Sequence, residues 1–214
     1  SNNKLQKCRI LPGNDILLSD EEIKSGIEKI RNQLSLDKSV LEGTLSDELL
    51  INVDNDIYLD KPISVYGTKR LVGNKSIIMK LDVDQYQCML NVMKGGCLIV
   101  DGATIDGNGA ASCVKVSQGA SMKMQSGKLI YGCPYGVEVY GDISMTGGTI
   151  SDTLSTAVYI RSFANGKMTG GSITNNVFNG IKTERDAYMK VSDNAVITNS
   201  GYSLVNNAGK CDIT

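Results

Sequence analysis

The 214-residue sequence contains no histidine and no tryptophan, and it has only two phenylalanines and three prolines. The absence of histidine excludes Ser/His/Asp and Cys/His nucleophile systems from this chain, together with any zinc site that needs an imidazole ligand. The formal charge of −1 argues against a general nucleic-acid binder, because such proteins carry a basic excess that neutralises phosphates. The scarcity of large aromatic residues means that the core must be built from Ile, Leu, Val and Met.

The lengths of the apolar runs argue against a membrane-spanning helix, and the spacing of the cysteines argues against a zinc site. No apolar run approaches the roughly 18–20 residues of a membrane-spanning helix, so we expect no membrane span. The six cysteines include no Cys-x-x-Cys pair, so we do not expect a closed four-cysteine zinc site. The sequence predicts no other metal or cofactor.

A repeat of about 23 residues runs through the chain from residue 89 onward. One set of short segments has its first apolar residue at positions 90, 114, 137, 158, 181 and 204, in steps of 21 to 24 residues. A second set ends at positions 100, 124, 145, 168, 191 and 213, and a third has an apolar residue at positions 105, 129, 150, 173 and 196. Three columns with one shared period predict three short strands in every repeat.

Each of these segments is three to five residues long and alternates apolar with polar residues, which is the period of a half-buried strand. Gly, Asn, Asp and Ser separate the segments, and nothing after residue 40 has the helical period over ten residues. Three short strands per repeat are typical of one coil of a solenoid, in which successive coils pair through parallel strands. The narrow interior of such a coil suits Ile, Val, Leu and Met and leaves no room for Trp.

The pattern resembles the right-handed parallel β-helix of the pectate-lyase-like superfold over roughly residues 49–214. The runs GGTI at 147–150 and GGSITN at 170–175 also look like the Gly-Gly-x-Ile-x-x-Asn repeat of bacterial surface β-helices, such as the polymorphic outer-membrane proteins. The resemblance implies an all-β, right-handed parallel β-helix solenoid and a secreted or cell-surface bacterial protein. It carries little information about activity, since the repeated residues are structural.

The two ends of a solenoid need caps, because they expose unpaired strand edges and apolar interior. We interpret residues 1–48 as an N-terminal segment with a capping helix over about 20–34, begun by a capping box at Ser19 and Glu22. A partner-binding helix is the alternative. Residues 49–214 form the solenoid, whose last coil around Cys211 has no visible closure. We expect further coils or domains of the same polypeptide to follow, with a covering partner as the alternative.

Outward positions of the first strand set form two columns that contain most of the charged and aromatic candidates. In these columns Lys115 lies beside Glu138, and Arg161 lies beside Glu184. One interpretation is a set of cross-strand ion pairs on a solvated face, each worth well under about 1 kcal/mol. The other is a shallow groove that binds a polysaccharide, a cell-surface glycan or a peptide. Its candidate ligand-binding residues are Glu138, Tyr140, Tyr159, Arg161, Lys182, Glu184 and Arg185.

Two sequence features relate to catalysis. The run IDGNG at 105–109 looks like a run common in polygalacturonases, but those enzymes also need a set of aspartates and a Gly-His-Gly element that this chain lacks. Pectate lyases use Ca²⁺ held by clustered carboxylates with an Arg or Lys base. Arg161 with Glu138 and Glu184 is the nearest approach to that arrangement, and Ca²⁺ is expected only under this alternative. We predict no catalytic residue.

The alignment of the coils also predicts where the cysteines and three turn asparagines lie. Cys88 and Cys113 fall within one position of each other on adjacent coils, so a disulfide between them is one alternative. We expect mostly reduced and buried thiols. Cys97 and Cys211 lie near inward positions. Asn108, Asn176 and Asn199 share one turn column, in which stacked amides would hydrogen-bond along the turns.

The sequence therefore favours a non-catalytic β-helix segment that acts as an adhesin or carbohydrate-binding scaffold. The alternative is a polysaccharide lyase or glycoside hydrolase of the same superfold, with its site on the first-strand face.

Overall fold

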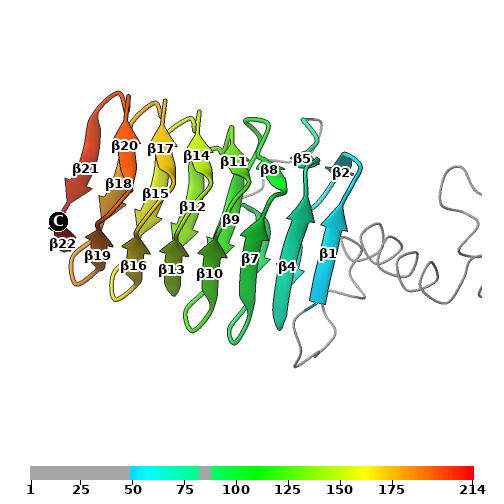
Figure 1. Cartoon of the computed structure of the whole chain (residues 1–214), viewed down its shortest axis with the longest axis horizontal. Coiled ribbons are helices and arrows are strands. Elements are labelled where there is room, and N and C mark those ends of the chain that lie inside the picture. The colour runs from blue at the N-terminus through cyan, green and yellow to red at the C-terminus, as the bar shows by residue number, and fades with distance from the viewer. Residues whose placement is uncertain (1–48, 82–87) are drawn as a thin grey trace, which may run out of the picture.

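The computed structural model describes residues 49–81 and 88–214, which form a parallel β-solenoid of about seven coils (Figure 1). The described residues contain strands and turns and no helix. The expected capping helix over about 20–34 lies outside the described residues. The repeat and the three strands per coil are confirmed.

Three parallel sheets run the length of the solenoid, and each coil contributes one strand to each of them. Sheet A consists of β1 (Leu49–Val53), β4 (Thr68–Gly73), β7 (Cys97–Asp101), β10 (Ser121–Met124), β13 (Asp142–Met145), β16 (Asn165–Met168), β19 (Tyr188–Val191) and β22 (Lys210–Ile213). Sheet B consists of β2 (Ile57–Leu59), β5 (Ser76–Met79), β8 (Thr104–Asp106), β11 (Lys128–Ile130), β14 (Thr149–Ser151), β17 (Ser172–Thr174) and β20 (Val196–Thr198). Sheet C consists of β3 (Ile63–Val65), β6 (Cys88–Val92), β9 (Ser112–Val116), β12 (Tyr135–Val139), β15 (Thr156–Ile160), β18 (Asn179–Thr183) and β21 (Ser203–Asn207).

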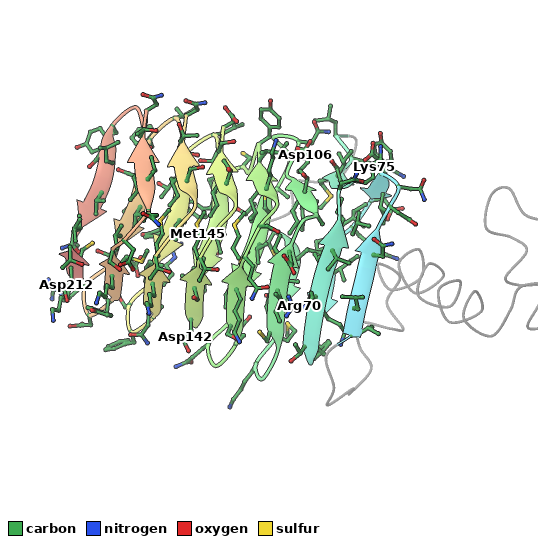
Figure 2. All side chains as sticks on the ribbon, in the orientation of Figure 1. Arg70, Lys75, Asp106, Asp142, Met145 and Asp212 are labelled. Carbon is green, nitrogen blue, oxygen red and sulfur yellow. The ribbon has the colours of Figure 1, made fainter. Side chains whose placement is uncertain are left out.

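The core consists of inward-facing side chains that stack in columns along the solenoid, with one or two columns from every sheet. In sheet A, Met124 pairs in register with Val100 and Met145, and the column continues through Met168 and Val191 to Ile213, as the repeat predicted. Met145 is labelled in Figure 2, which shows the side chains on both surfaces of the sheets. Before the last coil these inward residues are almost completely buried. The alternating pattern thus produces a narrow aliphatic core along the solenoid axis.

The last coil departs by one residue from the predicted columns. Ile197, and not Val196, pairs with Ile173, and Val205, and not Leu204, pairs with Ile181. Val196 and Leu204 are each 47% exposed, whereas Ile197 and Val205 pack against the core. Each prediction had to choose between two adjacent apolar residues, and packing on the preceding coil selects the second of each pair.

This shift also changes the predicted asparagine column. The residue three positions after Ile197 is Ser200, so Ser200 and not Asn199 follows Asn176 in the turn column. Asn176 Oδ1 accepts hydrogen bonds from the backbone N–H and the hydroxyl of Thr153, at 3.1 and 2.8 Å. The buried turn column therefore contains Thr, Asn and Ser, and it is not a ladder of amides.

The five cysteines of the described part are free thiols. Cys88 pairs in register with Ser112, one residue before Cys113, so the two cysteines are not direct neighbours. Burial raises the pKa of Cys113 to about 12 and that of Cys88 to about 11, so both stay protonated at neutral pH. Cys211 packs against the core, whereas Cys97 pairs with Ser121, in the outward register next to the inward Leu98.

The repeated glycines at the turns between sheets A and B are required by backbone conformation and by close packing. Gly148 and Gly171 have φ angles of 79° and 81°, in the left-handed region that side chains disfavour. A Cβ atom at Gly171 would also lie 2.7 Å from the carbonyl oxygen of Gly148 in the preceding coil. The Gly-Gly runs are therefore part of the stacking of the coils.

A matched pair of glycine variants separates these two effects. Gly95 has the same φ of 81° as Gly171, but a Cβ there would meet nothing within 4 Å. We expect Gly95→Ala to lower the free energy of unfolding by about 1 kcal/mol, from backbone strain, and Gly171→Ala to lower it by about 2–4 kcal/mol, since the neighbouring coil must also shift. Urea denaturation followed by circular dichroism measures both values. Equal losses would show that the close approach of the two coils costs nothing.

Candidate functional site

The candidate residues lie on the outward face of sheet C, over four adjacent strands. Lys115 on β9 pairs in register with Glu138 on β12, Glu138 with Tyr159 on β15, and Tyr159 with Lys182 on β18. The inward neighbours of these residues, such as Val137 and Val139, are completely buried in the core. Alternation along each strand therefore fixes the outward direction of the polar residues.

Arg161, which directly follows β15, is the centre of the cluster. Its Nε donates to Glu138 Oε1 at 2.9 Å, and its Nη1 donates to Glu184 Oε1 at 2.7 Å. The guanidinium carbon also lies 3.9 Å from the centroid of the Tyr159 ring. One cation thus joins two carboxylates from the coils on either side and covers an aromatic face.

Tyrosine side chains tie the carboxylates into the same network. The Tyr159 hydroxyl donates to Glu184 Oε1 at 2.7 Å, and the Tyr140 hydroxyl donates to Glu138 Oε1 at 3.1 Å. The ring of Tyr135 meets the ring of Tyr159 edge-on, with centroids 5.1 Å apart. We call Tyr135, Glu138, Tyr140, Tyr159, Arg161 and Glu184 the Arg161 cluster.

Two lysines lie at the ends of the Arg161 cluster. Lys115 Nζ lies 5.1 Å from the centroid of the Tyr140 ring, and Lys182 Nζ lies 4.7 Å from that of Tyr159. These contacts are cation–π interactions, worth about 0.5–1 kcal/mol each where solvent reaches them. The Lys115 side chain therefore lies over Tyr140, although its strand position is beside Glu138.

Burial and hydrogen bonding keep Arg161, Glu184 and the three tyrosines in their ordinary charge states at neutral pH. Partial burial disfavours the charges of Glu184 and Arg161, but their hydrogen bonds outweigh it: they lower the pKa of Glu184 to about 2 and raise the pKa of Arg161. Burial, followed by the hydrogen bond to Glu184, raises the pKa of Tyr159 to about 12. Burial also raises the pKa values of Tyr135 and Tyr140.

Six of the seven predicted ligand-binding residues come together, and one does not. Glu138, Tyr140, Tyr159, Arg161, Lys182 and Glu184 share contacts on the sheet C face. Arg185 lies in the exposed turn after β18, and the contacts of the cluster among the described residues do not include it. The predicted neighbours Arg161 and Glu184 form an ion pair at 2.7 Å.

The sequence prediction missed Tyr135 because the start of β12 breaks the alternation. Tyr135 pairs with Thr156 on the outer side, while Gly136 is buried and a Cβ there would meet Ile150 of the core. Gly136 and Val137 therefore both face inward, although they are consecutive. A small residue directly before the first apolar residue, as at Gly136, Ala157 and Gly180, is the sequence signal for this corner.

The IDGNG run at 105–109 forms a turn that is stabilised by its own polar groups. The backbone N–H of Asn108 donates to Asp106 Oδ1 at 2.7 Å, and Asn108 Nδ2 donates to the carbonyl of Met79 at 3.0 Å. Figure 2 labels Asp106 at the end of β8, and burial raises the pKa of its carboxyl. These contacts give the run a role in holding two coils together.

The described residues offer neither a cluster of metal ligands nor a membrane-spanning helix. Within residues 49–81 and 88–214 no three His, Cys, Asp or Glu side chains gather as ligands for a metal ion. No helix in that part is long and apolar enough to cross a membrane. Comparisons of the chain with protein-family models, with curated proteins and with solved structures found no match.

The lowered pKa of Glu184 predicts a pH-dependent contribution to stability. A carboxyl whose folded pKa lies below its unfolded value of about 4.5 stabilises the protein above that pH and loses its contribution as pH falls toward about 2. We expect Glu184→Gln to lower the free energy of unfolding by about 1–2 kcal/mol at pH 7, with a smaller difference from wild type at pH 3. Urea titrations at both pH values measure this.

Asp186→Asn is the control, because it removes an exposed carboxylate two residues away. The same pH dependence in both variants would contradict the specific role of Glu184.

Proposed function

We propose that this chain is a non-catalytic carbohydrate-binding segment of a secreted or cell-surface β-helix protein, and that the outward face of sheet C is its binding surface. The observation that carries the proposal is the Arg161 cluster, in which one guanidinium fixes two carboxylates and three tyrosines. Glu138 and Tyr159 are buried, and a ligand would meet the exposed members, such as Tyr140, already oriented, so little conformational entropy is lost on binding. Aromatic rings beside hydrogen-bonding and charged groups form the kind of surface that binds a sugar.

The charge states support binding over catalysis. A general acid or base works best with a pKa near the operating pH. Glu184, with a pKa of about 2, and Tyr159, with a pKa of about 12, are both far from that range, and Arg161 holds its proton more tightly than usual. The polysaccharide lyase alternative, in which Arg161 acts as the base beside bound Ca²⁺, requires the opposite shift at Arg161.

The proposal includes finer features of the fold and its context. Right-handed winding is the hand that nearly all parallel strand crossovers take, and the pectate-lyase-like resemblance implies the same. The GGTI and GGSITN runs favour a bacterial surface protein. These features rest on the repeat and on its resemblance to known β-helices.

Binding to a microarray of plant, fungal and bacterial polysaccharides tests the proposal. We expect wild type to bind at least one polysaccharide without degrading it, and Tyr140→Ala and Lys182→Ala each to weaken that binding about tenfold, since both side chains lie on the proposed surface. Arg185→Ala is the matched control, because it removes an exposed cation outside the Arg161 cluster. Circular dichroism confirms that the variants are folded.

Two results would contradict the proposal. The first is the absence of any bound polysaccharide, and the second is Ca²⁺-dependent cleavage of an acidic polysaccharide that Arg161→Lys abolishes. The second result would establish the lyase alternative.

A further inference from the structure

The turns between sheet B and sheet C line up along one edge of the solenoid (Figure 1). Large apolar side chains in these turns are exposed. These side chains come from four successive coils and are 48–71% exposed. We call them the B–C ridge: Tyr131, Leu154, Val177, Phe178 and Tyr202.

These turns bury polar residues and expose apolar ones. Thr153 and Asn176 are 0% and 2% exposed, while the next residues along the chain, Leu154 and Val177, are about half exposed. Burying a polar side chain costs free energy unless it is hydrogen-bonded, and the Nδ2 of Asn176 has no partner among the described residues. The hydrogen bonds between Thr153 and Asn176 Oδ1 account for the buried polar pair. They do not require a large apolar residue at the next, exposed position, so Leu154 and Val177 indicate a surface that binds something.

Two aromatic rings of the ridge lie side by side. Phe178 and Tyr202 occupy the same position in adjacent turns, directly before β18 and β21. Their ring centroids are 5.7 Å apart and the rings are tilted by 31°. Because successive coils stack at about 4.8 Å, rings in one column make a platform that runs along the solenoid axis.

The chemistry around the rings favours an uncharged ligand that forms many hydrogen bonds. Asp152 is the one charged residue in the four turns at 131–134, 152–155, 175–178 and 199–202. Asn175 and Asn199 are exposed in the same turns, with φ angles of 58° and 48°, and their amides both donate and accept hydrogen bonds. A pyranose ring presents an apolar C–H face with hydroxyls at its rim, which matches rings flanked by amides.

The ridge is also continuous with the sheet C face. Tyr135 directly follows the turn at 131–134, and its ring packs on Tyr159 of the Arg161 cluster. A polymer lying along the ridge would therefore run beside the proposed binding surface.

We propose that the B–C ridge is a stacking platform for a neutral hexopyranose chain that lies parallel to the solenoid axis. This inference rests on the proposed carbohydrate-binding function and names the class of ligand. It places Phe178 and Tyr202 under the sugar rings and the amides of Asn175 and Asn199 at their hydroxyls.

Affinity electrophoresis in native gels tests the inference, with galactomannan or hydroxyethylcellulose as neutral polymers and polygalacturonate as the acidic one. We expect a neutral polymer to retard wild type, and Phe178→Ala with Tyr202→Ala to weaken retardation at least tenfold. The control is Phe163→Ala, which removes a 77% exposed phenylalanine from the turn after β15, away from the ridge. All three residues are exposed, so their replacement costs little stability.

Three results would overturn the inference. If the double variant binds neutral polymers as wild type does, the ridge is not the platform, while the carbohydrate-binding proposal stands. If only polygalacturonate retards wild type, the ligand class is wrong. If sedimentation shows a wild-type dimer that the double variant loses, the ridge is an interface between two copies of the chain. Failure of wild type to bind any polymer would instead contradict the proposed function itself.

Discussion

Parallel pairing in a fixed register joins each coil to the next, and this pairing determines which outward residues are neighbours. A residue on one coil has as its neighbours the equivalent residues of the coils before and after it, about 4.8 Å away. Arg161 and Glu184 meet in this way, through the pairing of β15 with β18. Arg161 reaches Glu138 on the other side diagonally, since Glu138 is paired with Tyr159. Diagonal neighbours on adjacent strands lie within reach of a long side chain.

The balance of energies in this cluster differs from that of ordinary surface ion pairs. An exposed pair contributes little, because water screens it and two flexible side chains must be ordered. Glu138 is buried, so its charge depends on Arg161 and on the Tyr140 hydroxyl for compensation. Removing the partner of a buried charge costs far more than the pair contributes when intact. The Arg161–Glu184 pair is one of the cross-strand ion pairs that the sequence also allowed, and it remains partly exposed, whereas Glu138 is buried.

The sequence was sufficient to predict the repeat, three strands per coil and six members of the candidate site. It was sufficient because the period of about 23 residues identifies which residues stack on adjacent coils. The period of two along each strand then tells whether a side chain faces inward or outward. The errors arose where those periods are locally ambiguous. Val196 with Ile197, and Leu204 with Val205, are adjacent apolar residues, and only contact with the preceding coil decides which one faces inward.

The site residues that the sequence prediction missed or misplaced were missed for equally local reasons. Tyr135 precedes a corner at which two consecutive residues face inward, so counting by twos assigns it to the wrong side. The position of Lys115 was predicted, but its side chain leaves Glu138 for the ring of Tyr140, because the carboxylate is already bound by Arg161. Competition for one acceptor cannot be read from strand register alone.

The core and the outer surfaces of this solenoid are under separate constraints. Inward columns and turn glycines are fixed by stacking, so a residue such as Gly171 has no freedom that function can use. The B–C turns also pair from coil to coil through hydrogen bonds, but the side chains that they and sheet C direct outward lie outside the core. The turns even bury Asn176 and expose Val177, at a cost in stability. The buried pair Thr153 and Asn176 joins two coils by hydrogen bonds, but these bonds do not require the exposed residues beside it to be large and apolar, so the composition of the ridge points to a contact outside the solenoid.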